Sequence, residues 1–166
     1  MTAAKKRRRA PARRKSPAAS ATVAAAPIPV CELCLETGGT LLWSDKHCRV
    51  VLVVDPDYAG FCRVVWNEHV REMTDLSSAR QHHCMRVVFA VEQALRKVLK
   101  PHKINLASFG NLTPHVHWHV IPRRVNDAHF PESVWGKRQR TTSRPGTSLS
   151  ALVLRRRLSA ELQRLL

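Results

Sequence analysis

The sequence lacks an apolar run of about 18 residues, which is the length that a transmembrane helix requires. It also lacks a secretion signal: the stretch 18–30 follows a basic run, but it contains two prolines and no Leu-rich segment. The five cysteines, at positions 31, 34, 48, 62 and 84, are an odd number. With no export signal, this predicts a reducing, cytoplasmic location in which the thiols are free or bind a metal.

Acidic residues are almost absent from both ends of the chain, and this explains the net charge of +16. Residues 1–15 contain eight Lys or Arg and no acid, and residues 137–166 contain eight with a single acid, Glu161. Residues 16–136 hold twelve basic and eleven acidic residues. The near-neutral middle argues against nucleic acid as the main partner, whereas the basic ends predict at most weak, nonspecific binding to polyanions.

The composition divides the chain into three parts. Residues 1–26 are rich in Ala, Pro, Lys, Arg and Ser, have little to bury, and are expected to be disordered. Residues 27–136 are predicted to form one domain with its own core. Residues 137–166 form a basic extension, in which leucines at helical spacing over 152–166 predict a short amphipathic helix. That helix could dock on the domain, pair with another chain, or lie on an acidic surface.

Hydrophobic periodicity predicts a sheet covered by a helix. Strands are expected at 41–43, 48–54, 61–66, 104–109 and 115–121. A helix is expected to begin near residues 75–78 and to end at Pro101, with one apolar stripe facing the sheet. The later segment 127–135 resembles a loop but carries two large aromatics. We therefore expect it to pack back on the domain or on a partner subunit.

The strongest local signal is a row of three histidines, His115, His117 and His119, that alternates with apolar residues. The two-residue period of a strand places the imidazoles on one face, about 6.6 Å apart, and the apolar residues in the core. Neighbouring imidazoles disfavour protonation of one another, so neutral nitrogens remain for attack or metal binding. The row predicts a catalytic or metal-binding strand that ends at Pro122, since proline cannot donate to a ladder.

Other polar residues give weaker signals when each is taken alone. Cys31 and Cys34 form half of a tetrahedral zinc site, and the missing ligands would have to be histidines because no second Cys-x-x-Cys follows. His69 follows a predicted strand and would by itself be a solvated loop histidine. The loop around Asn111 could present donors to an anion or be an ordinary hairpin turn.

In combination, residues 31–136 resemble the histidine triad (HIT) nucleotide hydrolases and transferases. The features that carry the resemblance are Cys31-x-x-Cys34, Asp55 after a strand, His69 before a helix, Asn105, and the histidine row followed by Ile121-Pro122-Arg123. The resemblance implies an α+β fold with a five-stranded antiparallel sheet and one main helix. It also implies a homodimer in which two sheets become one continuous sheet.

The chemistry that the resemblance implies is hydrolysis at the α-phosphate of nucleoside phosphoramidates or dinucleoside polyphosphates. His117 would attack phosphorus to form a covalent nucleotidyl-histidine, from which water releases a nucleoside monophosphate. His119 would bond to phosphate oxygen and help to protonate the leaving group. Asn105 and Asn111 would offer amide donors to the phosphate.

The resemblance further implies a ribose contact and a metal. Asp55 would accept from the ribose hydroxyls, with Asp57 as a rival because the turn is short. A structural zinc would be held by a closed tetrahedron of four residues. These ligands would be Cys31, Cys34, His69 and His115.

Two departures from the family pattern concern the loop before the row. Asn111 stands where Gln is usual, and Leu112 stands where a small hydroxyl residue is usual, while Pro114 precedes His115. They put the choice of substrate in question and leave the nucleophile untouched. Two other functions stay open: a metal-dependent hydrolase with all three histidines as ligands, and a nonenzymatic nucleotide-binding module that relies on its basic tails.

Overall fold

The computed structural model describes residues 31–141 and 149–165, so the disorder expected for 1–26 lies outside the described residues. The strands are β1 (Thr40–Ser44), β2 (Cys48–Leu52), β3 (Cys62–Trp66), β4 (Lys103–Ala107) and β5 (His117–Arg123). The helices are α1 (Glu32–Leu35), α2 (Ser78–Leu99), α3 (Ala151–Leu165) and the short 3-10 turn η1 (Met73–Asp75). Within the described ranges, no helix is long and apolar enough to span a membrane.

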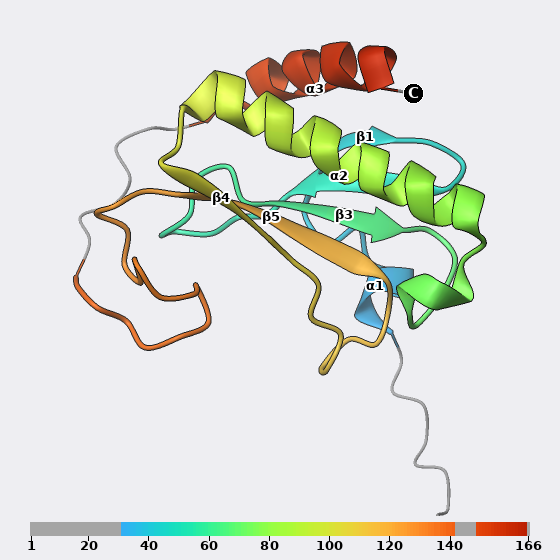
Figure 1. The fold of residues 1–166 in the computed structure, drawn as a ribbon, viewed down its shortest axis with the longest axis horizontal. Coiled ribbons are helices and arrows are strands. Elements are labelled where there is room, and N and C mark those ends of the chain that lie inside the picture. Colours follow the sequence, from blue (N-terminus) through green and yellow to red (C-terminus); the bar gives the residue numbers. More distant parts are fainter. Residues whose placement is uncertain (1–30, 142–148, 166) are drawn as a thin grey trace, which may run out of the picture.

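The five strands form one antiparallel sheet in the order β1-β2-β3-β5-β4. This confirms the predicted α+β fold with a five-stranded antiparallel sheet. Helix α2 runs across one face of the sheet, as expected from its apolar stripe (Figure 1). The division of the chain into a tail, a domain and an extension stays a prediction.

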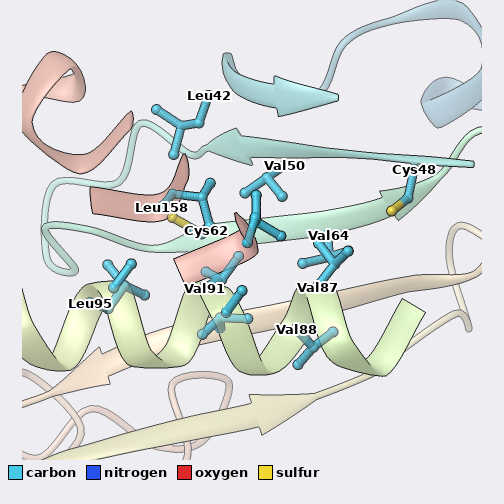
Figure 2. Packing of buried hydrophobic residues seen from close by; sticks show 14 of the residues in the cluster. Leu42, Cys48, Val50, Cys62, Val64, Val87, Val88, Val91, Leu95 and Leu158 are labelled. Atoms are coloured by element: carbon cyan, nitrogen blue, oxygen red, sulfur yellow. The ribbon is translucent and has the colours of Figure 1, made fainter. Parts of the chain in front are cut away.

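The main core lies between the sheet and α2. Alternate residues of β2 and β3, including Val50 and Val64, point from the sheet toward Val87, Val91 and Leu95 of the helix (Figure 2). All five of these side chains are buried. Because successive residues of a strand face opposite sides, the residues between them are directed to the other face of the sheet.

Helix α3 docks on the domain, which was one of the three arrangements left open for the C-terminal helix. It lies beside α2, on the side away from most of the sheet, and also contacts β1 (Figure 1). Its leucines Leu154, Leu158 and Leu162 join the main core. Buried Glu161 accepts hydrogen bonds from Lys97 of α2 at 2.7 Å and from Arg164 at 2.9 Å. These two cations offset the cost of burying the carboxylate of Glu161 away from water.

The histidine strand β5 lies between β3 and β4. Trp118 and Val120 pack with the main core, so the alternation of histidines and apolar residues has the predicted effect. His115 differs from the prediction, because it lies just before β5. The neighbouring Val116 is nevertheless tied to this part of the sheet, since its N–H donates to the carbonyl of Val70 at 2.7 Å and its carbonyl accepts from Trp66 N–H at 3.0 Å.

Pro122 also differs from the prediction, because it lies inside β5 and does not end it. It pairs with Ile104 of β4, whereas the ladder to β3 has already ended at the pair Cys62 and Val120. No strand on the β3 side therefore requires a donor from residue 122, and the missing N–H is tolerated there.

Candidate active site

His117 and His119 lie together on the face of the sheet opposite α2. Their ring centroids are 4.8 Å apart, and only 5% and 6% of their surfaces are exposed. Nδ1 of His117 lies 2.6 Å from the carbonyl oxygen of His115. Because a carbonyl can only accept, Nδ1 carries the proton, and Nε2 keeps the lone pair that a nucleophile needs.

Both imidazoles are neutral at neutral pH. Burial is the main cause that lowers the pKa of His117, and the positive charge of Arg63 adds to it. Burial lowers the pKa of His119 to about 3, with further contributions from His117 and Arg63. Since desolvation penalises a charged imidazole, this cavity favours the nucleophilic form of the ring.

A cavity of about 370 Å³ opens over the two histidines. Its lining consists of Arg63, Phe109, Asn111, Leu112, Thr113, His117, His119 and Trp135. The ring centroid of Trp135 lies 5.1 Å from that of His119 and 4.7 Å from that of Phe109, and both ring pairs are T-shaped. The segment 127–135 thus packs back on the domain, and it brings an aromatic wall to the histidines.

The predicted phosphate ligands Asn105 and Asn111 occupy different places. Asn111 lines the cavity over the histidines. Asn105 lines a neighbouring cavity of about 310 Å³, and its side-chain oxygen accepts a hydrogen bond from Arg123 at 2.6 Å. Phe109 and Trp135 line both cavities, so the two spaces adjoin.

Asp55 holds the turn after β2. Its Oδ1 accepts from the backbone N–H groups of Asp57 at 2.8 Å and Tyr58 at 3.0 Å. Asp55 is not among the residues that line either cavity. Its rival Asp57 accepts a hydrogen bond from Arg138 at 2.7 Å. A local role in the turn therefore accounts for the contacts of Asp55.

The sequence prediction missed Arg123 as an organising residue of the loop after β5. This side chain is 2% exposed and pairs with Asp127 at 2.7 Å. It also donates to Asn105 and, at 2.8 Å, to the carbonyl of Glu132. The guanidinium thus links β4 to the loop that carries Trp135. The sequence signal that could have identified it is the opposite charge of Arg123, at the end of the strand, and Asp127, four residues later.

The sequence prediction also missed Arg63, which lies in β3 directly opposite His119 of β5. The register that makes them neighbours cannot be seen in either strand alone. Once β3 and β5 are paired, the alternation of β3 places Arg63 on the histidine face. An arginine between buried apolar residues was the signal that could have identified it.

The other end of the histidine row lies among cysteines. Nδ1 of His115 is 3.4 Å from Sγ of Cys31 and 3.5 Å from Sγ of Cys34. Nδ1 of His69 is 3.3 Å from Sγ of Cys34. The four ligand atoms all lie within 4.8 Å of one another. The structure thus gathers the four predicted metal ligands.

These distances fit a tetrahedral zinc ion. Zn–S bonds of about 2.3 Å and Zn–N bonds of about 2.0 Å place neighbouring ligand atoms about 3.5 Å apart. Nε2 of His115 lies 2.6 Å from the carbonyl oxygen of Trp66, so Nε2 carries the proton and Nδ1 faces the sulfurs unprotonated. Arg49 supports the cysteine segment by donating to the carbonyl of Leu33 at 2.6 Å.

Comparison with known proteins gives matches to histidine triad proteins. A family model described as the HIT domain matches residues 35–126. An "AP-4-A phosphorylase" of Mycobacterium tuberculosis is 28% identical over 106 residues, which are 60% of this chain and 54% of that protein. The chain therefore spans about half the length of the curated relatives it matches.

Solved structures of histidine triad proteins share the fold. One from Bradyrhizobium japonicum is 27% identical, with a TM-score of 0.59, over 79% of this chain and 92% of that one. A Zn-bound histidine triad family protein from Mycobacterium smegmatis is 21% identical, with a TM-score of 0.53, over 81% of this chain and 94% of that one.

Proposed function

Because the chain belongs to the HIT domain family, we propose that it is a nucleotide-processing enzyme, and specifically a hydrolase that acts on the α-phosphate of dinucleoside polyphosphates or nucleoside phosphoramidates. The observation that carries the proposal is the state of His117. Its Nδ1 proton is committed to the carbonyl of His115, and the ring lines the cavity with its other nitrogen unprotonated.

In the proposed reaction, Nε2 of His117 attacks the α-phosphorus. A phosphorus–nitrogen bond forms, the bond to the leaving group breaks, and a nucleotidyl-histidine results. Neutral His119 carries one N–H, which can donate to a phosphate oxygen or protonate the leaving atom, an oxygen in a dinucleoside polyphosphate and a nitrogen in a phosphoramidate; the attacking water returns this proton in the second step. Water then attacks the phosphorus, releases the nucleoside monophosphate and regenerates His117.

We assign the other predicted substrate contacts as follows. Asn111 donates its amide to the phosphate from the edge of the cavity. Asn105, whose oxygen is held by Arg123, has its NH2 group available to a ligand in the adjoining cavity. Asp55 has Oδ1 engaged in the turn, so only Oδ2 is available for a ribose hydroxyl. The aromatic rings of Phe109 and Trp135 offer surfaces for the base.

We propose that Cys31, Cys34, His69 and His115 hold a structural zinc ion. The support is the spacing of the four ligand atoms and the fixed tautomer of His115. Such an ion would tie the segment before β1 to the start of β5. With four protein ligands it would have no open position for a substrate, and its role would be to stabilise the fold.

The two other functions are less well supported. For a catalytic metal held by all three histidines, His115 would have to face His117 and His119, whereas its Nδ1 faces the cysteines. A nonenzymatic nucleotide-binding module would not explain why His117 is buried and neutral at the cavity. The homodimer, the cytoplasmic location and weak polyanion binding by the basic ends stay predictions of this proposal.

The test is product formation from diadenosine tetraphosphate and from adenosine phosphoramidate by wild type and His117→Ala. We expect AMP release from at least one substrate by wild type, unaffected by brief chelation, and a loss of at least about a thousandfold in the variant. His82→Ala, at an exposed position of α2, is the control for loss of a histidine. Equal turnover by His117→Ala would remove this residue from the mechanism.

A further inference from the structure

Arg63 lines the cavity over the histidines but has no role in the reaction proposed above. It is the only residue with a permanent charge among the described residues that line the cavity over His117 and His119. Its Nε is buried and has no hydrogen-bond partner. Among the described residues, no carboxylate lies within salt-bridge distance of it. A buried donor of this kind is uncommon and calls for a partner.

Two other arginines on the neighbouring strands, Arg49 and Arg123, are engaged in hydrogen bonds within the protein. Arg49 of the adjacent strand β2 donates to the backbone carbonyls of Leu33, Glu36 and Thr37. Arg123 of β5 donates to Asp127 and Asn105. These two guanidiniums hold segments of the protein together. Arg63, in contrast to Arg49 and Arg123, has an Nε without a partner in the protein, which suggests that its guanidinium binds a ligand.

A second buried atom without a hydrogen-bond partner belongs to the residue opposite Arg63. Nδ1 of His119 is also buried without a partner, and His119 is the residue directly opposite Arg63 across the two strands. Arg63 and His119 line the same cavity, and each has a nitrogen without a partner, so this wall suits a ligand that brings several oxygens. A phosphate group has this chemistry, and the planar guanidinium matches it with parallel N–H donors.

We propose that Arg63 binds a nonbridging oxygen of the α-phosphate while His117 attacks it. The inference rests on the proposed function for the identity of the reacting group. It adds the positive charge that the three histidines and two asparagines do not supply. Held at the cavity wall opposite His119, this charge stabilises the negative charge that builds up on the phosphate oxygens.

A packing role is the competing explanation. The guanidinium carbon of Arg63 lies 5.9 Å from the ring centroid of Phe61, so the side chain could serve to cover that ring. In that case the loss of Arg63 would disturb the cavity for any ligand. The role in phosphate binding instead predicts an effect only on ligands that carry a phosphate.

The experiment is calorimetric titration of AMP and of adenosine into wild type, Arg63→Gln and Arg63→Lys. We expect Arg63→Gln to bind AMP roughly 10- to 100-fold more weakly and adenosine within about twofold of wild type, since one charge-assisted interaction is lost. Arg63→Lys should recover part of the AMP affinity, because it retains the charge without the planar fork. Arg86→Gln, at an exposed position of α2, is the control for the change in net charge.

Unchanged AMP binding in Arg63→Gln, or an equal loss for AMP and adenosine, would overturn the inference. Circular dichroism of each variant verifies the fold, and the lysine variant provides a second reading if the glutamine variant is unstable. The assay needs no turnover. A protein that hydrolyses neither substrate, yet shows the AMP-specific loss, would refute the proposed hydrolysis while phosphate binding by Arg63 stands.

Discussion

The two ends of the histidine row have opposite environments although they differ by only four residues. At one end, both ring nitrogens of His115 have partners, namely the cysteine sulfurs and the carbonyl of Trp66. At the other end, Nδ1 of His119 has no partner, and the ring borders a cavity. The first arrangement suits a structural tie, and the second suits a ligand that arrives from solution.

This difference arises from the neighbouring segments, because the residue type is the same. Cys31 and Cys34 reach His115 from the segment before β1, and His69 reaches it from the loop after β3. Arg63 meets His119 through the register of β3 with β5. His117 lies between the two environments, with one nitrogen committed and the other available. We therefore expect changes at the two ends to affect different properties.

The largest effect is expected from breaking the cysteine end. Cys31→Ser should lose bound zinc and about 3 kcal/mol or more of unfolding free energy, because binding of a structural metal contributes directly to folding. Elemental analysis and denaturant unfolding measure the two quantities, with His82→Ala as the control. Wild-type protein that is purified gently and carries no zinc would refute the metal assignment.

The next effect is expected at the cavity end. His119→Ala should lower kcat/KM for diadenosine tetraphosphate about 100- to 1,000-fold, because it removes the donor to the reacting phosphate. Its zinc content should stay near that of wild type. Steady-state kinetics and elemental analysis on one preparation test both statements. A variant that loses zinc along with activity would show that the two ends are not separate.

A third effect concerns acid stability. The ordinary pKa of histidine is 6.5, and burial lowers the pKa of His119 to about 3 in the folded protein. Between these values only the unfolded chain binds the proton, so unfolding free energy falls as the pH decreases from 6.5 toward 3. The slope from this residue is at most about 1.4 kcal/mol per pH unit. His119→Gln should flatten the profile in urea unfolding across this range, and an unchanged slope would contradict the burial argument.

The smallest effect is expected at the aromatic wall. Trp135→Ala should raise KM for nucleotides roughly threefold to tenfold and leave kcat nearly unchanged, because the ring contributes contact area but no proton or charge. Val125→Ala is a control near the start of the same loop, since Val125 is 56% exposed. An effect on kcat larger than that on KM would give Trp135 a part in the reaction step.

Much of the fold could be predicted from local patterns. The β-branched run at 48–54 and the return strand at 61–66 predicted a hairpin, which the structure forms over Cys48–Leu52 and Cys62–Trp66. The alternating row 115–121 predicted which residues face the core. Cys31 and Cys34 could be assigned to a metal site only together with His69 and His115, through the family resemblance. Taken alone, the Cys-x-x-Cys pair indicated only half of a metal site, and His69 by itself indicated a solvated loop histidine.

The remaining features depend on contacts between distant residues. Arg63 lies opposite His119 only because β3 pairs with β5, and the register of this pairing cannot be predicted from the sequence of either strand alone. The hydrogen bond from Arg123 to the side-chain oxygen of Asn105, at the adjoining cavity, likewise joins residues that are distant in the sequence. The leucine stripe of α3 predicted an apolar face without identifying the surface that covers it. These are tertiary effects that local periodicity does not contain.

One histidine of the row, His117, is proposed to become covalently modified, while His115, two residues earlier, is proposed to hold the fold through zinc. The most direct measurement is mass spectrometry of peptides after wild-type protein is mixed with diadenosine tetraphosphate and quenched within the first turnover. We predict a nucleotidyl group on His117, its absence from His115, and its absence from the His117→Ala protein. A nucleotidyl group on His115, or turnover with no modified histidine, would contradict this division of roles between the two histidines.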